Sequence, residues 1–242
     1  MFFVYSSLCH KVTEQSLYLC YYAIAVLKKA NEEDDMDDKK MQRMDSEQRL
    51  ENFGLDQIMQ KLDIKEDDQI MDVGACTGAF SLPIANKTKE GHVYAVDVDA
   101  KPLEVLKRKI LKKSIDNITP ILIDTDVKVI QNSVFDSGLD MLAVEENSMD
   151  KIFICTVLHE VHDKSDFLTR YKRYLKDDGK IFIVEFASER RTAPYKAPDK
   201  AHAKRHFISQ KDVKKLLNDT SFKNIEVTDI NQLIYMISAE RD

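Results

Sequence analysis

The chain has 242 residues, of which 43% are hydrophobic and 32% charged, and its formal net charge is -6. This composition is typical of a globular protein with one large α/β domain, alone or with an appendage. The negative charge argues against a nucleic-acid partner, because nucleic-acid binders usually present a strongly basic face.

The four cysteines are scattered along the chain without C-x-x-C spacing. Such cysteines form no disulfide framework and no zinc site, and they suit a reducing compartment. We therefore expect a cytoplasmic protein that holds no metal.

The first residues of the chain differ from the rest. Residues 1–27 are rich in Phe, Tyr, Leu and Val, but their densest apolar run, 18–27, is too short to span a bilayer. The stretch has neither the basic leading segment nor the A-x-A-like cleavage site that is typical of a signal peptide. The apolar stretch suits a helix that packs on the domain or a partner, a lid over an active site, or a peripheral membrane contact. Residues 31–47 are polar, so we expect a helical and linker extension over 1–42 and a domain over 43–242.

From about residue 50, short apolar runs alternate with segments of helical period, the pattern of a parallel sheet with crossover helices. The predicted helices are 55–62, 79–86, 102–114, 164–175 and a helix capped by Ser209 that runs to 218. The predicted strands are 69–73, 92–96, 118–123, 151–155 and 180–186, followed by a hairpin of 224–230 and 232–239. The expected fold is α/β, a Rossmann-like three-layer αβα sandwich with a mostly parallel seven-stranded sheet ending in an antiparallel hairpin. A plain dinucleotide dehydrogenase would not be expected to end with such a hairpin.

The most informative segment is Asp72-Val73-Gly74-Ala75-Cys76-Thr77-Gly78, between a predicted strand and a predicted helix. Glycines let the backbone turn sharply and approach a ligand, and the helix N-terminus presents free N–H groups to a polar ligand head. Asp97 follows the next strand, where a carboxylate can accept hydrogen bonds from both ribose hydroxyls of a nucleoside cofactor.

A dinucleotide fits these residues less well. The G-x-G-x-x-G pattern needs glycine at position 76 and glycine or alanine at 79, and the chain has Cys76 and Ala79. Asp72 suits a cationic amino group, which a dinucleotide lacks. The other interpretation is a strand-to-helix turn that needs its glycines for packing alone.

These residues carry a family resemblance. Residues 70–78 with 93–97 resemble motifs I and II of class I S-adenosylmethionine-dependent methyltransferases. Residues 148–161 resemble the fourth-strand motif of that class, and 171–180 its R-x-L-K-P-G-G turn. The order and spacing resemble most the ubiquinone/menaquinone-biosynthesis methyltransferase-like branch, over roughly residue 43 to the C-terminus.

The resemblance implies S-adenosylmethionine as the cofactor, with its methionine end at the glycine turn, its ribose at Asp97 and its adenine beside Val98. An acid after the third strand usually meets the adenine amino group. Asp124 matches by position, while a second frame over 127–136 offers Ser133 or Asp136 instead. Cys76 and Asp177-Asp178 depart from the family pattern. The predicted cofactor-binding set is Asp72, Gly74, Ala75, Thr77, Gly78, Asp97, Val98, Asp124 and Thr156.

His159-Glu160-Val161-His162 invites a metal interpretation, but H-E-x-x-H spacing is absent and no third ligand is evident. Contact with substrate or cofactor, and capping or packing, both remain open for these histidines. His159 and His162 are the candidate general bases, because histidine titrates near neutral pH.

Two other features of the sequence concern a possible substrate site. Cys155 lacks the Pro-Cys context of base methyltransferases and suits a small buried residue. The basic residues between 190 and 206 suit either a solvated loop or a cover that attracts an anionic substrate.

The predicted function is in-line transfer of a methyl group from S-adenosylmethionine to an unidentified small molecule, in which positioning supplies most of the catalysis. The alternatives are a non-catalytic cofactor-binding or scaffold protein and, disfavoured by the glycine spacing, a nicotinamide-dependent oxidoreductase.

Overall fold

The computed structural model describes residue 41 and residues 45–123, 144–187 and 207–242. The chain divides into two compact units, Met1–Met44 and Asp45–Asp242, and the second contains all the elements described below. The predicted roles of residues 1–27 lie outside the described residues, and the predicted domain boundary at 43 stays a prediction. Among the described helices, none combines the length and apolar character needed to cross a membrane.

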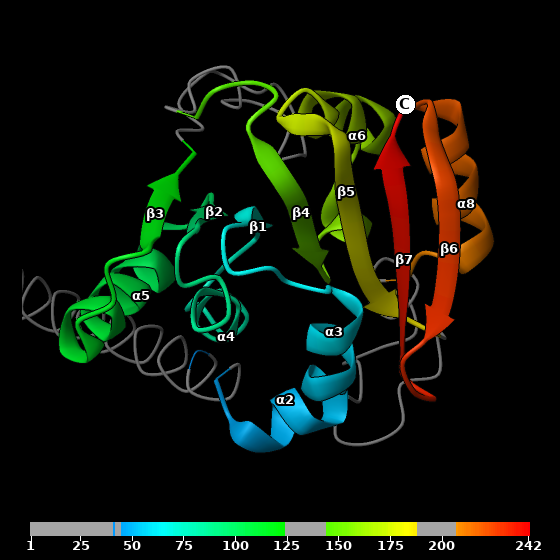
Figure 1. Ribbon diagram of the computed structural model, residues 1–242. Coiled ribbons are helices and arrows are strands. Elements are labelled where there is room, and N and C mark those ends of the chain that lie inside the picture. The colour runs from blue at the N-terminus through cyan, green and yellow to red at the C-terminus, as the bar shows by residue number, and fades with distance from the viewer. Residues whose placement is uncertain (1–40, 42–44, 124–143, 188–206) are drawn as a thin grey trace, which may run out of the picture. The chain divides into compact units, whose positions relative to one another are not determined.

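A seven-stranded sheet with the order β3-β2-β1-β4-β5-β7-β6 forms the centre of the second unit (Figure 1). Its first five strands are parallel, and β7 runs antiparallel to both of its neighbours, β5 and β6. The strands are β1 (Gln69–Val73), β2 (His92–Asp97), β3 (Ile118–Leu122), β4 (Met149–Cys155), β5 (Leu175–Phe186), β6 (Phe222–Asp229) and β7 (Ile234–Arg241). The predicted sheet is therefore confirmed, including its terminal hairpin.

The direction of the crossovers reverses between the neighbouring strands β1 and β4. In open α/β sheets, ligands bind at the carboxyl ends of the strands beside such a reversal. A ligand site is therefore expected at the carboxyl ends of β1, β2, β4 and β5.

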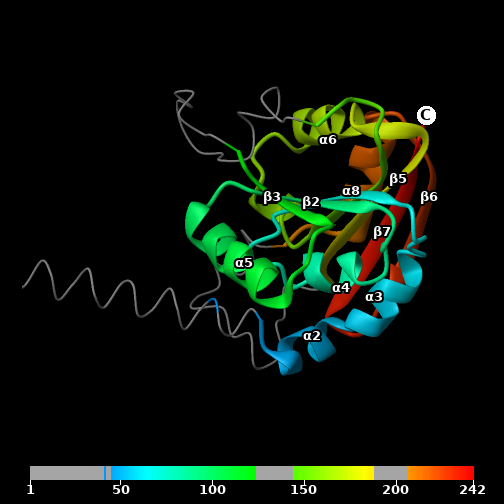
Figure 2. The ribbon, with the colours of Figure 1, turned by 60° about the vertical axis from the view of Figure 1, so that its left-hand side comes forward.

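Helices cover both faces of this sheet, as Figure 2 shows for α4 and α5 on one side and α6 on the other. Side chains alternate between the faces along each strand, so Ile70 joins one core and Met71 the other. The α-helices are α2 (Glu47–Phe53), α3 (Leu55–Lys61), α4 (Ser81–Ala85), α5 (Ala100–Lys113), α6 (Lys164–Lys172) and α8 (Gln210–Asp219), with a 3-10 helix η2 (Leu158–Glu160) after β4. This is the predicted three-layer sandwich.

Helix α2 was not predicted, although its end signals are present in the sequence. The Ser46 hydroxyl accepts a hydrogen bond from the Arg49 N–H at the start of α2, and Gly54 ends the helix with φ +71°. Phe53 is its buried residue. The helix has only two turns and follows a polar segment, so the apolar periodicity was too short to predict it.

The predicted helix 164–175 is too long at its end. Helix α6 stops at Lys172, and Leu175 instead pairs with Met149 as the first residue of β5. The register then shifts, so that Lys180 pairs with Lys151. Pairing with β4 therefore places Leu175 in a strand, although the helical period predicted it at the end of α6.

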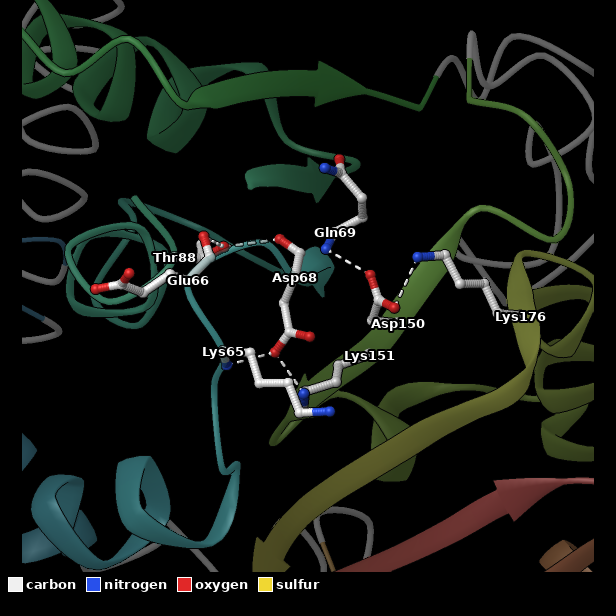
Figure 3. A network of polar contacts seen from close by, with 8 residues as sticks. All are labelled: Lys65, Glu66, Asp68, Gln69, Thr88, Asp150, Lys151 and Lys176. Carbon is white, nitrogen blue, oxygen red and sulfur yellow. Dashed lines mark hydrogen bonds and ion pairs between the residues drawn. The ribbon is translucent and has the colours of Figure 1, made fainter. Parts of the chain in front are cut away.

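The amino ends of β1 and β4 are joined by a polar network (Figure 3). The buried Asp68 carboxylate accepts hydrogen bonds from Lys151 Nζ and, at 2.8 Å, from the Lys65 N–H. Asp150 accepts from the Gln69 N–H at 2.8 Å and from Lys176 Nζ at 2.7 Å. This network lies at the amino ends of the strands, on the side of the sheet opposite the expected ligand site. We therefore infer that it stabilises the fold and does not bind a ligand.

Candidate functional site

The turn after β1 has a left-handed backbone at three positions, with φ +77° at Gly74, +50° at Cys76 and +82° at Gly78. A Cβ on Gly74 would lie 2.2 Å from Val157 Cγ2, and one on Gly78 would lie 2.3 Å from Leu106 Cδ1. Backbone conformation and packing therefore both require these glycines. Their presence alone does not demonstrate a ligand.

Cys76 occupies the left-handed position where the family pattern has its middle glycine. A side chain in this conformation costs about 1–2 kcal/mol. The Cys76 N–H donates to Asp97 Oδ2 at 2.7 Å, which compensates part of that cost. Burial, followed by the charge of Asp97, raises the pKa of the Cys76 thiol. The residue is thus a neutral thiol beside the turn.

Asp97 ends β2 and is 7% exposed. Besides the bond from Cys76, its carboxylate accepts hydrogen bonds from the N–H groups of Val98 at 2.7 Å and Asp99 at 3.0 Å. Burial raises the pKa of Asp97, and these backbone donors oppose the rise. A carboxylate offers about four acceptor positions, so about one is left for a ligand, on Oδ2.

Asp72 lies one strand away, on β1, and is 3% exposed. Its Oδ2 accepts a hydrogen bond from the Ser81 hydroxyl of α4 at 2.5 Å. Burial raises the pKa of Asp72 to about 7, and the negative charge of Asp97 contributes to the rise. The structure therefore brings together two desolvated carboxyl groups that sequence analysis had predicted separately.

Thr77 is fully buried within the turn. Its hydroxyl donates to Asp45 Oδ1 at 2.6 Å, and Lys109 Nζ of α5 bonds both Asp45 Oδ2, at 2.5 Å, and the Thr77 carbonyl, at 2.8 Å. Sequence analysis missed Asp45 and Lys109, because only the fold brings them to this turn. Contact of Thr77 with a cofactor stays a prediction.

The other predicted cofactor residues either bond within the protein through their backbone or lie outside the described residues. Thr156 follows β4 with φ +55°, and its N–H donates to the Val184 carbonyl at 2.8 Å. The Val98 N–H is taken by Asp97. Asp124 and the alternatives Ser133 and Asp136 lie outside the described residues, as do the basic residues between 190 and 206.

Cys155, the last residue of β4, is a neutral thiol. Desolvation raises its pKa well above the usual range, although the charge of Arg49 opposes this. That electrostatic effect reflects how close α2 brings Arg49 to the carboxyl end of β4.

The two predicted bases are in different surroundings. The His159 side chain is 4% exposed, and its Nδ1 lies 2.7 Å from Oε2 of the fully buried Glu185 on β5. The His159 N–H also donates to Glu185 Oε1 at 3.2 Å. His162, three residues later, is exposed. Glu185 was missed because no sequence motif marks it.

Aromatic rings lie beside this pair. The Phe186 ring centroid is 6.1 Å from that of His159 and 5.8 Å from that of Phe53 of α2. The guanidinium carbon of Arg49 lies 4.4 Å from the Phe53 ring centroid. The unpredicted α2 thus adds a cation and an aromatic side chain near the ends of β4 and β5.

Residues 71–183 match the model of a family described as a methyltransferase domain. A ubiquinone/menaquinone biosynthesis C-methyltransferase of Geotalea uraniireducens is 27% identical over 156 residues, which cover 62% of this chain and 61% of that protein. This chain therefore spans less than two thirds of the length of that relative.

Solved structures share the fold. An S-adenosylmethionine-dependent methyltransferase from Aquifex aeolicus has a TM-score of 0.69 at 20% identity, over 84% of this chain and 98% of that one. A phosphoethanolamine N-methyltransferase of Haemonchus contortus, solved with S-adenosylmethionine, has a TM-score of 0.60 at 15% identity, over 78% of this chain and 52% of that one. At these identities the similarity concerns the fold.

Proposed function

We propose that this chain, which carries a class I S-adenosylmethionine-dependent methyltransferase domain, transfers the methyl group of S-adenosylmethionine to a small molecule. The observation that carries the proposal is that two buried carboxyl groups, Asp72 and Asp97, lie near enough to interact electrostatically beside the glycine turn, toward the carboxyl ends of β1 and β2.

The chemistry of this site suits S-adenosylmethionine better than a dinucleotide. Two desolvated carboxyl groups favour a cationic ligand and oppose a pyrophosphate. S-adenosylmethionine carries a sulfonium and an ammonium group. In this proposal the Asp72 carboxylate pairs with the ammonium group, and Asp97 Oδ2 accepts a hydrogen bond from one ribose hydroxyl. The proposed cofactor-contacting set also includes Gly74, Ala75, Thr77, Gly78, Val98, Asp124 and Thr156.

When bound, the cofactor supplies an electrophilic methyl carbon and a neutral thioether leaving group. The residues of the chain have to align the acceptor and exclude water, and such positioning contributes up to about 7–11 kcal/mol. Phe186, which is half-buried, offers apolar surface for a small acceptor at the end of β5. His159 and His162 stay the proposed bases, and the scattered thiols favour the cytoplasm as the location.

The experiment is calorimetric titration with S-adenosylmethionine and S-adenosylhomocysteine, with NADH as the control ligand. We expect micromolar binding of both sulfur compounds, loss of that binding in Asp97→Ala, and no binding of NADH. Asp116→Ala is the matched control, because it removes the same charge from an exposed position before β3. Absence of binding by both sulfur compounds would contradict the proposal. Formation of S-adenosylhomocysteine in the presence of acceptors distinguishes an enzyme from a scaffold.

A further inference from the structure

The glycine turn is held in two different ways along its length. Near its start, the Gly74 N–H donates to the Val96 carbonyl of β2 at 2.8 Å. Further along, side chains from two other segments hold Thr77. Lys109 Nζ of α5 donates to the Thr77 carbonyl at 2.8 Å, and the Thr77 hydroxyl donates to Asp45 Oδ1 at 2.6 Å. The position of Thr77 therefore depends on residues that are far from it in the sequence.

Asp45 and Lys109 also bind each other, with 2.5 Å between Lys109 Nζ and Asp45 Oδ2. We call the three residues Asp45, Thr77 and Lys109 the turn clamp. The Lys109 and Asp45 side chains are 25% and 26% exposed, so salt screens this ion pair less than it screens one on the open surface. Hydrogen bonds of charged groups are also stronger than those between neutral groups. The turn clamp is therefore a set of strong, partly shielded bonds that meet at Thr77.

The Thr77 side chain has no surface to offer to a ligand. Thr77 is fully buried and its hydroxyl bonds to Asp45, whereas Cys76 before it and Ala79 after it are half-buried. The backbone of Thr77 nevertheless joins two residues with a left-handed conformation, Cys76 at φ +50° and Gly78 at φ +82°. A displacement of Thr77 would move both of them. The turn clamp therefore determines where the accessible part of the turn lies.

We propose that Asp45 and Lys109 are positioning residues, which by holding Thr77 keep the accessible part of the turn in the arrangement that binds S-adenosylmethionine. This inference rests on the proposed function for its ligand, but the order of the turn can be measured without any ligand. Asp45 is the first residue of the second compact unit, so the turn clamp also ties the start of that unit to the turn. A change in the chain just before α2 should then affect the turn through Thr77.

The other interpretation is that the turn clamp only stabilises the fold. Helix α5 has apolar contacts of its own with the turn, because a Cβ on Gly78 would lie 2.3 Å from Cδ1 of the fully buried Leu106. Leu106 and Leu103 also belong to the core on that face of the sheet. The packing of α5 therefore does not depend on Lys109. Because a buried carbonyl needs a donor, the loss of Lys109 should affect Thr77 first.

Lys109→Met tests the turn clamp in the protein without cofactor, with the Cys76 thiol as the reporter. Burial raises the pKa of this thiol, against the effect of hydrogen bonding with Thr77, and thiols react as thiolates. The native turn should therefore react slowly with iodoacetamide. We expect Lys109→Met to raise the alkylation rate of Cys76 about tenfold at fixed pH, as measured by mass spectrometry of its peptide. Loss of a positive charge would by itself raise the thiol pKa and slow the reaction, so a faster rate reports opening of the turn.

Lys107→Met is the matched control, because it removes another lysine of α5. Lys107 pairs with Glu104 at 2.6 Å, and both side chains of this pair are exposed. Lys107→Met should keep the native alkylation rate of Cys76 and the native affinity for S-adenosylmethionine. Equal alkylation rates in Lys109→Met and Lys107→Met would overturn the role of the turn clamp in ordering the turn.

Affinity for S-adenosylmethionine tests the positioning role. Thr77→Val keeps the shape of the side chain without its hydroxyl, and Asp45→Ala removes the carboxylate. We expect each of them, like Lys109→Met, to bind about tenfold more weakly in calorimetry, under conditions where circular dichroism shows a folded protein. Thr77→Ser, which keeps the hydroxyl, should bind like the native protein. The double variant Asp45→Ala/Lys109→Met should bind no more weakly than the weaker of its single variants, because the turn clamp acts as one unit.

The opposite outcomes separate this inference from a structural role and from the proposed function. A lower unfolding midpoint with native affinity in Asp45→Ala and Thr77→Val would assign the turn clamp to stability alone and overturn the inference. Losses of affinity that add in the double variant would overturn it too, since the two residues would then act independently. If Lys109→Met fails to fold, the difference between Thr77→Val and Thr77→Ser still decides the outcome. Failure of the native protein to bind S-adenosylmethionine would contradict the proposed function, and the alkylation rates would still test the order of the turn.

Discussion

The Cys76 N–H donates to Asp97 Oδ2 across 2.7 Å, and this bond ties the turn after β1 to the end of β2. One carboxylate therefore both holds the turn in its left-handed conformation and offers its remaining acceptor position to a ligand. Changes at Asp97 should consequently affect both stability and cofactor binding, whereas a change of the Cys76 side chain, which keeps the backbone N–H, should affect stability alone.

Asp97→Asn should weaken both the stability of the turn and cofactor binding while keeping the size of the side chain, which Asp97→Ala does not. The amide keeps one acceptor oxygen but introduces an NH2 among three backbone donors, so we expect a loss of about 1–3 kcal/mol in unfolding free energy. S-adenosylmethionine affinity should fall at least tenfold. Urea denaturation and calorimetry measure the two quantities. Native affinity in this variant would exclude Asp97 from the cofactor site.

Cys76→Gly should stabilise the protein. The residue has φ +50°, a conformation that glycine adopts without the steric cost of a side chain. The expected gain in unfolding free energy is about 1 kcal/mol, with S-adenosylmethionine binding retained. Cys76→Val, with a branched side chain, should have the opposite effect on stability. Equal unfolding midpoints for all three proteins in urea would mean that the turn carries no strain at this position.

Asp72 should make the stability of the unliganded protein dependent on pH. Its pKa is about 7 in the folded protein, because of burial, against about 4 in an unfolded chain. The stabilising contribution is therefore fully present below about pH 4 and is lost as the pH rises through about 7. Asp72→Asn, which cannot ionise, should raise the melting temperature above pH 7 relative to the native protein. The test is thermal unfolding from pH 5 to 9, and parallel curves for the two proteins would contradict it.

Asp72 should also make cofactor binding dependent on pH, with the opposite sign. The ammonium group pairs with the ionised carboxylate, so affinity for S-adenosylmethionine should rise up to tenfold per pH unit below about pH 7 and level off above it. Asp72→Asn should bind more weakly and lose this dependence. Calorimetry at several pH values measures both effects, and an unchanged slope in the variant would assign the titration to another group.

Tyr171→Phe should be neutral or stabilising. Within the part of the chain that the structure describes, the Tyr171 hydroxyl has no hydrogen-bond partner, although the side chain is fully buried on α6. Removing an unsatisfied buried hydroxyl contributes about 1 kcal/mol to the unfolding free energy, which urea denaturation measures. A marked loss of stability would reveal a partner, and weaker cofactor binding would place that partner in the ligand.

Lys151→Met should be strongly destabilising, because it leaves the Asp68 carboxylate buried without its cation. The expected loss is about 3–5 kcal/mol in urea denaturation. The double variant Lys151→Met/Asp68→Asn should recover much of that loss, since it removes the uncompensated charge. A double variant as unstable as the single one would show that packing of the Lys151 side chain, and not the charge, matters at this site.

Local patterns in the sequence determined the order of the elements. Strand β1 has the predicted bounds, and Ser209 caps α8 as predicted, because apolar periodicity and a capping side chain act over a few residues. Asp72, the glycine turn and Asp97 were recognisable for the same reason, since Asp72 and Asp97 lie at the carboxyl ends of β1 and β2 and the turn follows β1 directly. The resemblance to methyltransferases depended on these short segments.

Only the tertiary structure decided which distant residues meet. The bonds from Thr77 to Asp45 and from His159 to Glu185 join positions 32 and 26 residues apart, and no local pattern encodes such pairs. The start of β5 at Leu175 was likewise set by pairing with Met149, which overrode the helical period. Burial then raised the pKa of Asp72 to about 7, against the opposing effect of the hydrogen bond from Ser81 of α4. The sequence thus determined the elements and the kind of cofactor, whereas the environment of each functional group arose from contacts that exist only in the folded chain.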